Sequence, residues 1–166
     1  MNEYLYHHGV KGMKWGVRKK QPTKTWKTRT KTGEELTVTK NRRGVVGSTV
    51  QKLTKQDFDV YQARNSKGKK VGTIQLDRKS KDEMNIVWMD TNRKQRGKGY
   101  ASALLETGER IAKEAGAKKL TAEVVGNSQD MQHIVDKRGY VKKGEIKTQE
   151  MLDIWDGLTL IELDLN

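Results

Sequence analysis

One stretch of the chain constrains the fold more than any other, because an apolar strand, a glycine-rich loop, an amphipathic helix and a second strand follow one another in residues 84–125. Met84–Asp90 (MNIVWMD) is typical of a buried strand, and Gly99–Ala115 repeats apolar residues about 3.6 positions apart, as a helix with one buried face does. Lys119–Val125 alternates apolar and polar residues, which predicts another strand. A strand–helix–strand unit makes a right-handed crossover between parallel strands. The sequence therefore predicts a mixed α/β sheet and excludes a helix bundle or a β-sandwich.

Shorter patterns surround this unit. Before it, Asp57–Asn65 and Val71–Arg78 alternate apolar and polar residues and are separated by tight turns, which predicts an antiparallel meander with Met84–Asp90. After it, a second helix is expected over Ser128–Arg138 and a last strand over Leu158–Leu165. The first helix is expected to bury the face formed by Ala101, Leu104, Leu105, Gly108, Ile111, Ala112 and Ala115.

Composition narrows the possible classes of protein. The chain has 166 residues, of which 33% are hydrophobic, and this suits one modest domain with an appended tail. It has no cysteine, which excludes disulfides, cysteine-ligated zinc and thiolate nucleophiles. We find no run near the roughly 18 apolar residues that span a bilayer and no signal-peptide pattern. We therefore expect a soluble protein with no membrane partner.

Positive charge is concentrated near the N-terminus. The chain holds 34 Lys and Arg against 21 Asp and Glu, a net charge of +13. Residues 1–43 hold 12 basic and three acidic residues, a net charge of +9, whereas residues 44–166 hold 22 against 18. Such a basic segment is typical of a docking arm, and we expect it to contact nucleic acid or a structural protein.

These observations divide the chain into three parts. Residues 1–22 form a basic tag with several glycines, and we expect it to be extended. Residues 23–56 form a threonine-rich hairpin, turning at Lys31–Glu34, followed by a connector; the hairpin could add the first strand of the sheet. Residues 57–166 form the predicted α/β domain.

The loop before the first helix is the best candidate for chemistry. It reads Arg96-Gly97-Lys98-Gly99-Tyr100-Ala101. Glycines let a backbone approach a ligand closely, and a helix start presents unpaired N–H groups to an anion, so a pyrophosphate would fit. The alternative interpretation is an ordinary basic turn that binds no ligand. The loop lacks the Gly-Lys-Ser/Thr ending of a P-loop, and it also lacks the third glycine and the acidic partner of a dinucleotide-binding fingerprint.

In this context the chain resembles the GNAT superfamily of acyl-CoA-dependent N-acyltransferases over about residues 57–165. The family's pyrophosphate loop, Arg/Gln-x-x-Gly-x-Gly/Ala, is matched by Arg96-x-x-Gly99-x-Ala101 between the family's fourth strand and third helix. The next strand ends at Asn127, and the following helix ends in Lys137-Arg138-Gly139-Tyr140. This resembles the family's Asn…Lys-x-Gly-Phe/Tyr signature with one extra residue in the helix.

The resemblance implies a V-shaped opening between the fourth and fifth strands that holds acetyl-CoA or CoA. The pyrophosphate would lie on Gly97–Ala101, and the pantetheine would pair with the edge of Met84–Asp90. In the family an amine attacks the thioester directly, without a covalent enzyme intermediate. The implied cofactor-binding residues are Met89, Asp90, Thr91, Arg96, Gly97, Lys98, Gly99, Tyr100, Ala101 and Asn127.

The catalytic positions depart from the family pattern. The tyrosine that often protonates the leaving thiolate is replaced by Val135, and the expected strand offers only Asp90 as a base. Glu123 and His133 are the other candidates. Histidine is the residue type suited to proton transfer near neutral pH, but side-chain statistics favour a solvent-facing position for His133 by about two to one. The family usually has two helices before its second strand, whereas residues 41–56 allow at most a short one near residues 49–53. We therefore expect a compact acceptor site.

The N-terminal run His7–Arg18 is similar to a short motif, H-x-G-x-K-G-x-K-W-G, that recurs in bacteriophage and prophage proteins, many of them head-associated. It suggests a phage protein, located in the host cytoplasm or the virion, with Trp15 as a docking anchor. Two adjacent histidines, His7 and His8, make an incomplete metal site, so no metal is expected. Two hypotheses follow: an N-acetyltransferase, or a catalytically weak or inactive accessory protein whose basic arm docks to nucleic acid or capsid.

Overall fold

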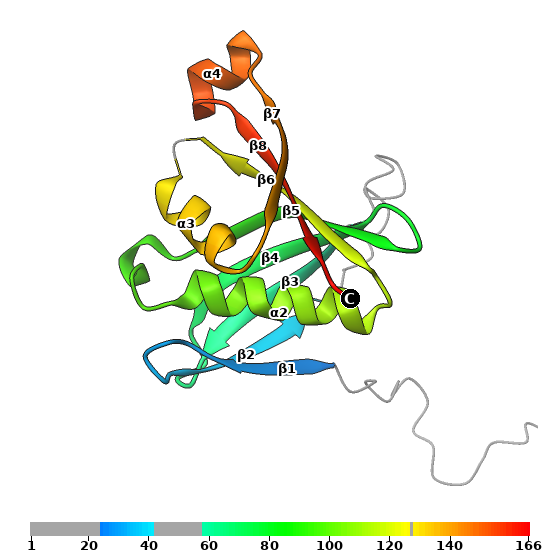
Figure 1. The fold of residues 1–166 in the computed structure, drawn as a ribbon. Helices are drawn as coiled ribbons and strands as arrows, with labels where there is room; N and C mark the ends of the chain where they lie inside the picture. Colours follow the sequence, from blue (N-terminus) through cyan, green and yellow to red (C-terminus); the bar gives the residue numbers. More distant parts are fainter. Residues whose placement is uncertain (1–23, 42–57, 127) are drawn as a thin grey trace, which may run out of the picture.

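The computed structural model describes residues 24–41, 58–126 and 128–166, and within them one mixed sheet organises the molecule (Figure 1). The strand order is β1-β2-β3-β4-β5-β6-β8-β7. The strands are β1 (Thr25–Arg29), β2 (Glu35–Lys40), β3 (Phe58–Asn65), β4 (Lys70–Arg78), β5 (Glu83–Thr91), β6 (Lys119–Val125), β7 (Val141–Ile146) and β8 (Leu158–Asp164). The helices are α2 (Tyr100–Glu114), α3 (Gln129–Lys137) and α4 (Gln149–Trp155), with a 3₁₀ turn η1 at Arg93–Gln95.

The antiparallel meander and the parallel crossover agree with the sequence prediction. Strands β1 to β5 form an antiparallel meander, β5 pairs with β6 in parallel, and β6, β8 and β7 are again antiparallel. Helix α2 is the crossover between β5 and β6 and packs mainly on β4 and β5. The mixed α/β sheet is thus confirmed. No helix in the described ranges is long and apolar enough to cross a membrane.

The N-terminal hairpin is part of the sheet. Strand β2 pairs with β3, and the hairpin contributes Trp26, Leu36 and Val38 to the hydrophobic core. The Trp26 ring meets Tyr61 edge-on at 5.5 Å, and its indole Nε1 donates a hydrogen bond of 2.9 Å to Glu114 at the end of α2. The basic segment 1–43 is therefore not a single arm, because its second half is a structural element of the domain.

Helix α2 buries a slightly different face from the predicted one. Tyr100, Ala103 and Thr107 are buried in addition to the central apolar residues. Ala101 is only half-buried because it faces a cavity above the first turn, and Ala115 is exposed because the helix has already ended there. Both were expected inside, so these two positions were wrong.

A β-bulge opens the sheet between β5 and β6. Gln75 of β4 lies opposite Trp88, but the next residue of β4 lies opposite Ile86, so Val87 is the extra residue of β5. A bulge bends its strand and increases its twist. The parallel pairing with β6 ends at Ile86–Ala122, immediately before the bulge. Beyond it, Val87 and Trp88 are 43% and 58% exposed, and the two strands diverge.

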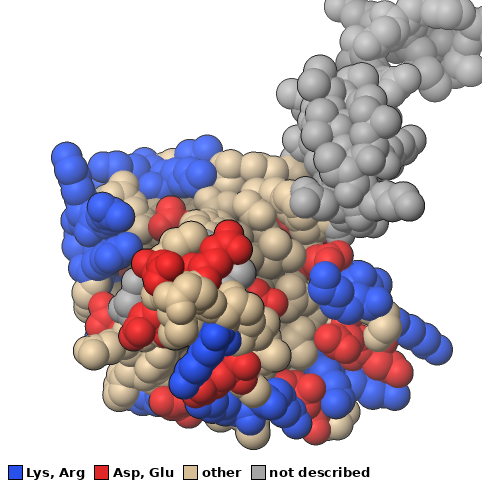
Figure 2. Space-filling view, turned by 90° about the horizontal axis from the view of Figure 1, so that it is seen from above, with Lys and Arg blue, Asp and Glu red and all other residues tan. Residues whose placement is uncertain are grey.

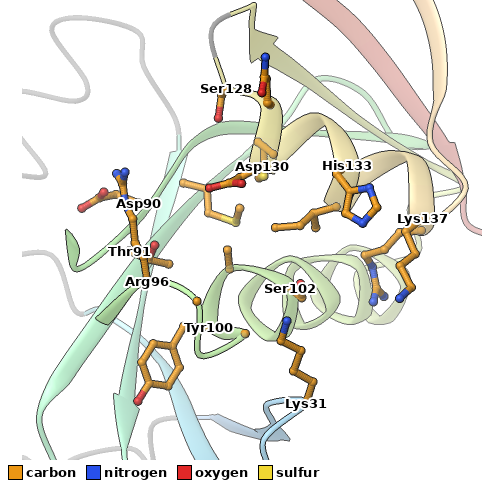
Figure 3. Close-up of a pocket in the computed structure, with 18 residues that line it drawn as sticks. Lys31, Asp90, Thr91, Arg96, Tyr100, Ser102, Ser128, Asp130, His133 and Lys137 are labelled. Carbon is orange, nitrogen blue, oxygen red and sulfur yellow. The ribbon is translucent and has the colours of Figure 1, made fainter. Parts of the chain in front are cut away.

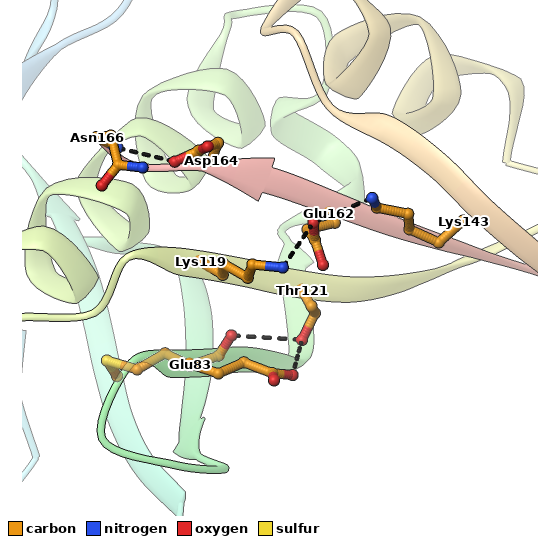
Figure 4. A network of polar contacts seen from close by, with 8 residues as sticks. Glu83, Lys119, Thr121, Lys143, Glu162, Asp164 and Asn166 are labelled. Carbon is orange, nitrogen blue, oxygen red and sulfur yellow. Dashed lines mark hydrogen bonds and ion pairs between the residues drawn. The ribbon is translucent and has the colours of Figure 1, made fainter.

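The opposite end of this strand pair is closed by polar contacts (Figure 4). The Thr121 hydroxyl on β6 lies 3.3 Å from a Glu83 carboxylate oxygen and 3.1 Å from the Asn85 side-chain oxygen, both on β5. Glu162 of β8 is bridged by Lys143 at 3.2 Å and Lys119 at 3.3 Å, and Lys143 is the main reason that the pKa of Glu162 is lowered. The sheet is therefore joined at one end and split at the other.

Candidate functional site

A cavity of about 870 Å³ lies where the sheet splits (Figure 3). The end of β5, the loop that follows η1, the first turn of α2, the outer face of α3 and the turn between β1 and β2 enclose it. It is lined by Lys31, Met89, Asp90, Thr91, Arg96, Gly97, Gly99, Tyr100, Ala101, Ser102, Ser128, Gln129, Asp130, Met131, His133, Ile134, Lys137 and Arg138.

The start of α2 is built to receive an anion. Gly97 and Gly99 have φ values of 80° and 83°, a left-handed conformation that favours glycine. Gly99 is the N-cap residue, and no side chain of the described residues caps the helix. The first-turn N–H groups of α2 and the positive end of its dipole are therefore available to a ligand. Arg96 adds a full positive charge to the same wall of the cavity.

The β1–β2 turn supports this loop from below. A Cβ on Gly99 would lie 3.0 Å from Cγ and 3.3 Å from the backbone nitrogen of Lys31. The Thr32 hydroxyl donates to the Lys98 carbonyl oxygen at 3.4 Å, and the Tyr100 hydroxyl donates to the Glu34 carboxylate. Burial, followed by this bond to Glu34, raises the pKa of Tyr100. The loop is thus held in place by a segment about 66 residues earlier in the chain.

Helix α3 presents one face to the cavity. Asp130, His133, Ile134 and Lys137 occupy positions i, i+3, i+4 and i+7, which fall on one side of a helix. Met131 and Ile134 are partly buried against the core, and with Met89 of β5 they form an apolar stretch in the cavity wall. The cavity therefore combines the cationic, amide-rich start of α2 with an apolar stretch of wall.

Most residues predicted to bind a cofactor lie together. The lining residues among them are Met89, Asp90, Thr91, Arg96, Gly97, Gly99, Tyr100 and Ala101. The side chain of Lys98 is exposed and does not line the cavity; its carbonyl oxygen instead accepts the bond from Thr32. Asn127 lies outside the described residues, as do His7, His8 and Trp15 of the tag and the segment near residues 49–53.

The catalytic candidates are separated. Asp90 and His133 both line the cavity but lie on opposite sides of it (Figure 3), so they cannot act on the same atom. Glu123 does not line the cavity. It is exposed on β6, between the buried Ala122 and Val124, and therefore points to the other face of the sheet.

Val135, which occupies the position of the family's tyrosine, does not face the cavity. Val135 is 3% exposed and belongs to the core, whereas Ile134 faces the cavity. Because one residue turns a helix by about 100°, the extra residue in α3 changes which position faces the cavity. Neither residue carries a hydroxyl, so neither can protonate the thiolate as the family's tyrosine does.

Sequence reasoning missed Lys31, Ser102 and Lys137. Lys137 could have been found from the spacing of α3, since it lies about two helical turns after Asp130 and so on the same face. Lys31 gave no local signal, because its position depends on how the hairpin docks on a distant loop.

Comparison with family models gives two matches. Residues 31–140 match the model described as "Acetyltransferase (GNAT) family". This match starts in the β1–β2 turn, earlier than the span of 57–165 indicated by the sequence motifs, and so it includes β2. Residues 1–22 match a separate model, described as a family of unknown function (DUF7211). None of the curated proteins compared with the chain matches it.

Several solved structures share the fold. A GNAT family acetyltransferase from Elizabethkingia anophelis with acetyl-CoA bound is 15% identical, with a TM-score of 0.65 over 78% of this chain and 97% of that chain. An acetyltransferase from Bacillus subtilis in complex with CoA is 12% identical, with a TM-score of 0.66 over 84% and 99%. The spermidine/spermine N-acetyltransferase SpeG from Vibrio cholerae, in mutant forms, is 11% identical, with a TM-score of 0.61 over 72% and 75%. At identities this low, the similarity shows a shared fold but does not indicate a shared substrate.

Proposed function

Because the chain belongs to the acetyltransferase (GNAT) family, we propose that it transfers an acetyl group from acetyl-CoA to an amine. The observation that carries the proposal is the uncapped start of α2, which opens through two left-handed glycines onto a cavity at the split in the sheet. This combination supplies an anion site beside an unpaired strand edge, and acyl-CoA has the matching parts: a pyrophosphate followed by an amide-containing arm.

Along the cavity, successive groups of lining residues would match successive parts of acetyl-CoA. The first turn of α2 and Arg96 would hold the pyrophosphate. Beyond Ile86 no described strand pairs with the β6 side of β5, so its backbone could bond the pantetheine amides as an added strand would. Met89, Met131 and Ile134 would cover the apolar parts of this arm.

The thioester supplies the acetyl group: the amine nitrogen bonds to the acetyl carbon, the carbon–sulfur bond breaks, and the thiolate takes up a proton. Asp90 is the proposed proton acceptor for the amine. It follows Trp88 by two residues, so both side chains point to the same side of β5, and both are exposed. An amine arriving over Trp88 would therefore meet the Asp90 carboxylate. His133 lies across the cavity and is not proposed as the base.

If Asp90 is the base, its replacement should lower activity much more than replacement of His133. Asp90→Asn should lower kcat/KM by about 100-fold, because a positioned base typically contributes 10²–10⁴-fold, and should change the Kd for acetyl-CoA less than about threefold. His133→Gln should change kcat less than about threefold. Transfer to polyamines, amino acids and lysine peptides can be followed by a thiol reagent, which reports only released CoA because the chain has no cysteine. Equal losses in both variants would reject Asp90 as the base.

The same assay separates the two hypotheses. Acetyl-CoA binding with transfer to an amine supports the enzyme. Binding without transfer to any acceptor class supports the alternative, a GNAT-fold accessory protein that retains the ligand but not the reaction. Absence of acetyl-CoA binding contradicts the enzyme and its cofactor, and leaves the accessory protein in which the fold is only a scaffold.

The separate family match of residues 1–22 favours a second role for the tag. We propose that the tag docks the protein to nucleic acid or to a phage structural protein. Residues 1–22 hold five basic residues and one acidic residue. On the face shown in Figure 2, by contrast, Asp and Glu side chains interrupt the basic ones.

A nucleic-acid role for the tag predicts a strong dependence on salt. Affinity for double-stranded DNA should fall steeply between 50 and 200 mM salt, by about tenfold or more for a few phosphate contacts, and should be lost on deleting residues 1–22. Acetyl-CoA binding should be unchanged by this deletion, because β1 begins at Thr25. DNA binding that survives the deletion would place the contact on the domain instead.

A further inference from the structure

A second group of cations lies on the cavity rim, away from Arg96. Lys31 comes from the β1–β2 turn and Lys137 from the last turn of α3, and the Ser102 hydroxyl lies in the first turn of α2. We propose that Lys31, Lys137 and Ser102 bind the 3′-phosphate of CoA and make the protein select CoA over dephospho-CoA. The inference rests on the proposed function and names a specificity determinant within it.

The backbone of Lys31 is fixed by its turn. The Thr30 N–H donates to the Glu34 carbonyl oxygen at 3.0 Å, and the Gly33 N–H donates to the Thr30 carbonyl oxygen at 2.9 Å. The Thr30 side chain is buried, accepts a bond from the Glu34 N–H at 3.1 Å and lies 2.8 Å from the Thr32 hydroxyl. A turn with these contacts cannot shift far when a ligand arrives, so the start of the Lys31 side chain is preorganised.

The stem of Lys31 is directed by the glycine loop. Its Cγ lies against Gly99, where an added Cβ would approach it to 3.0 Å, so a larger residue at this position would push the stem aside. Figure 3 shows the Lys31 nitrogen directed toward the first turn of α2 beside Ser102. The ammonium is therefore brought to the cavity rim by packing and needs no acidic partner to hold it there.

The charges of the rim are unbalanced. Arg138 is neutralised, because Glu109 accepts two bonds from its guanidinium, one of 2.7 Å from Nε, and Glu106 lies 3.8 Å away. Lys31 and Lys137 have no acidic partner anywhere in residues 24–41, 58–126 and 128–166. Two unpaired ammonium groups that face one cavity favour a ligand with more than one negative charge, and a phosphate monoester supplies it.

The position of these groups separates them from the pyrophosphate site. Figure 3 shows Arg96 on one side of the first turn of α2, Lys31 beside Ser102 on the other side, and Lys137 farther along the helix. A pyrophosphate held by Arg96 and the helix amides would leave the second group free. CoA carries a third phosphate on its ribose, and dephospho-CoA lacks only that phosphate. The pair of ligands therefore isolates the contribution of the rim.

The test is calorimetry of the full chain with CoA and with dephospho-CoA. The unchanged protein should bind CoA about tenfold more tightly, the gain expected from charge-assisted bonds at a partly exposed site. Lys31→Gln and Lys137→Gln should each weaken CoA about threefold to fivefold and dephospho-CoA less than about twofold, and the double variant should bind both ligands equally. Arg29→Gln is the matched control: it removes the same charge from the exposed end of β1, outside the cavity, and should leave both affinities unchanged.

The outcomes are distinguishable. Equal affinity of the unchanged protein for the two ligands would overturn the inference and leave the proposed function standing. Equal weakening of both ligands by Lys31→Gln would also overturn it, because the lysine would then act on the pyrophosphate or through its general field. If the protein binds neither ligand, the proposed function fails as well. Melting temperatures of the variants within a few degrees of the unchanged protein would show that folding is not the cause.

Discussion

Replacement of Gly99 by glutamate should abolish acetyl-CoA binding, with a loss in affinity of more than about 100-fold, or about 2.7 kcal/mol. Three effects act together. The residue has φ +83°, which strains any side chain; a Cβ would press on Lys31 at 3.0 Å; and the new carboxylate would lie at the helix start proposed to hold the pyrophosphate. Calorimetry with acetyl-CoA measures the loss directly.

Gly116→Glu is the matched control for this variant. Gly116 also has a left-handed φ, +80°, but a Cβ there meets nothing within 4 Å, and the residue lies beyond the other end of α2, outside the cavity. Both variants should lose similar stability from backbone strain, about 1 kcal/mol, while only Gly99→Glu should lose ligand binding. If both bind acetyl-CoA equally well, the start of α2 is not the anion site.

Gly72→Val should cost the largest amount of folding free energy among the predicted variants, about 3 kcal/mol. A Cβ on Gly72 would lie 2.7 Å from the backbone carbonyl oxygen of Asp90 and 3.2 Å from a methyl group of Leu104, which is fully buried. A carbonyl in a paired strand cannot rotate away, so β5 itself would have to move. That strand end lines the cavity, and acetyl-CoA affinity should therefore fall together with stability.

Gly144→Val provides the comparison. Gly144 also lies in a strand, β7, but its added Cβ would make only an ordinary contact of 3.7 Å with Leu160. Urea unfolding should show a much lower midpoint for Gly72→Val and a change below about 1 kcal/mol for Gly144→Val. Equal midpoints would mean that the close approach of β4 and β5 at Gly72 is not under steric constraint.

The sequence correctly predicted the elements whose hydrophobic period lies within a single segment. The strand before the loop, helix α2 and strand β6 each carry a period that one segment can display, and the parallel contact follows from the crossover rule. Glu123 could have been placed correctly by the same reasoning, because the alternation in Lys119–Val125 puts it on the opposite face from Ala122 and Val124. Its inclusion as a catalytic candidate followed the chemistry of carboxylates and not its position on the strand.

Other features have no local sign. The run around Val87 is continuously apolar, so nothing in it marks an extra residue, and the bulge follows from pairing with β4. Helix α4 has only seven residues, which is too short a run for a helical period to be told from a short strand or a loop. The rim lysines come together only in the folded chain. The cavity wall thus depends in part on contacts between segments that are distant in sequence.

The support of the glycine loop by the β1–β2 turn has a consequence for how the protein matures. The turn is synthesised first, but the residues it supports follow about 66 positions later, so the ligand site cannot exist until most of the chain has left the ribosome. A ligand that contacts both the β1–β2 turn and the glycine loop would bind only the native chain. It would therefore raise the free energy of unfolding of the whole sheet. Ligand binding would therefore be thermodynamically linked to the folding of the sheet.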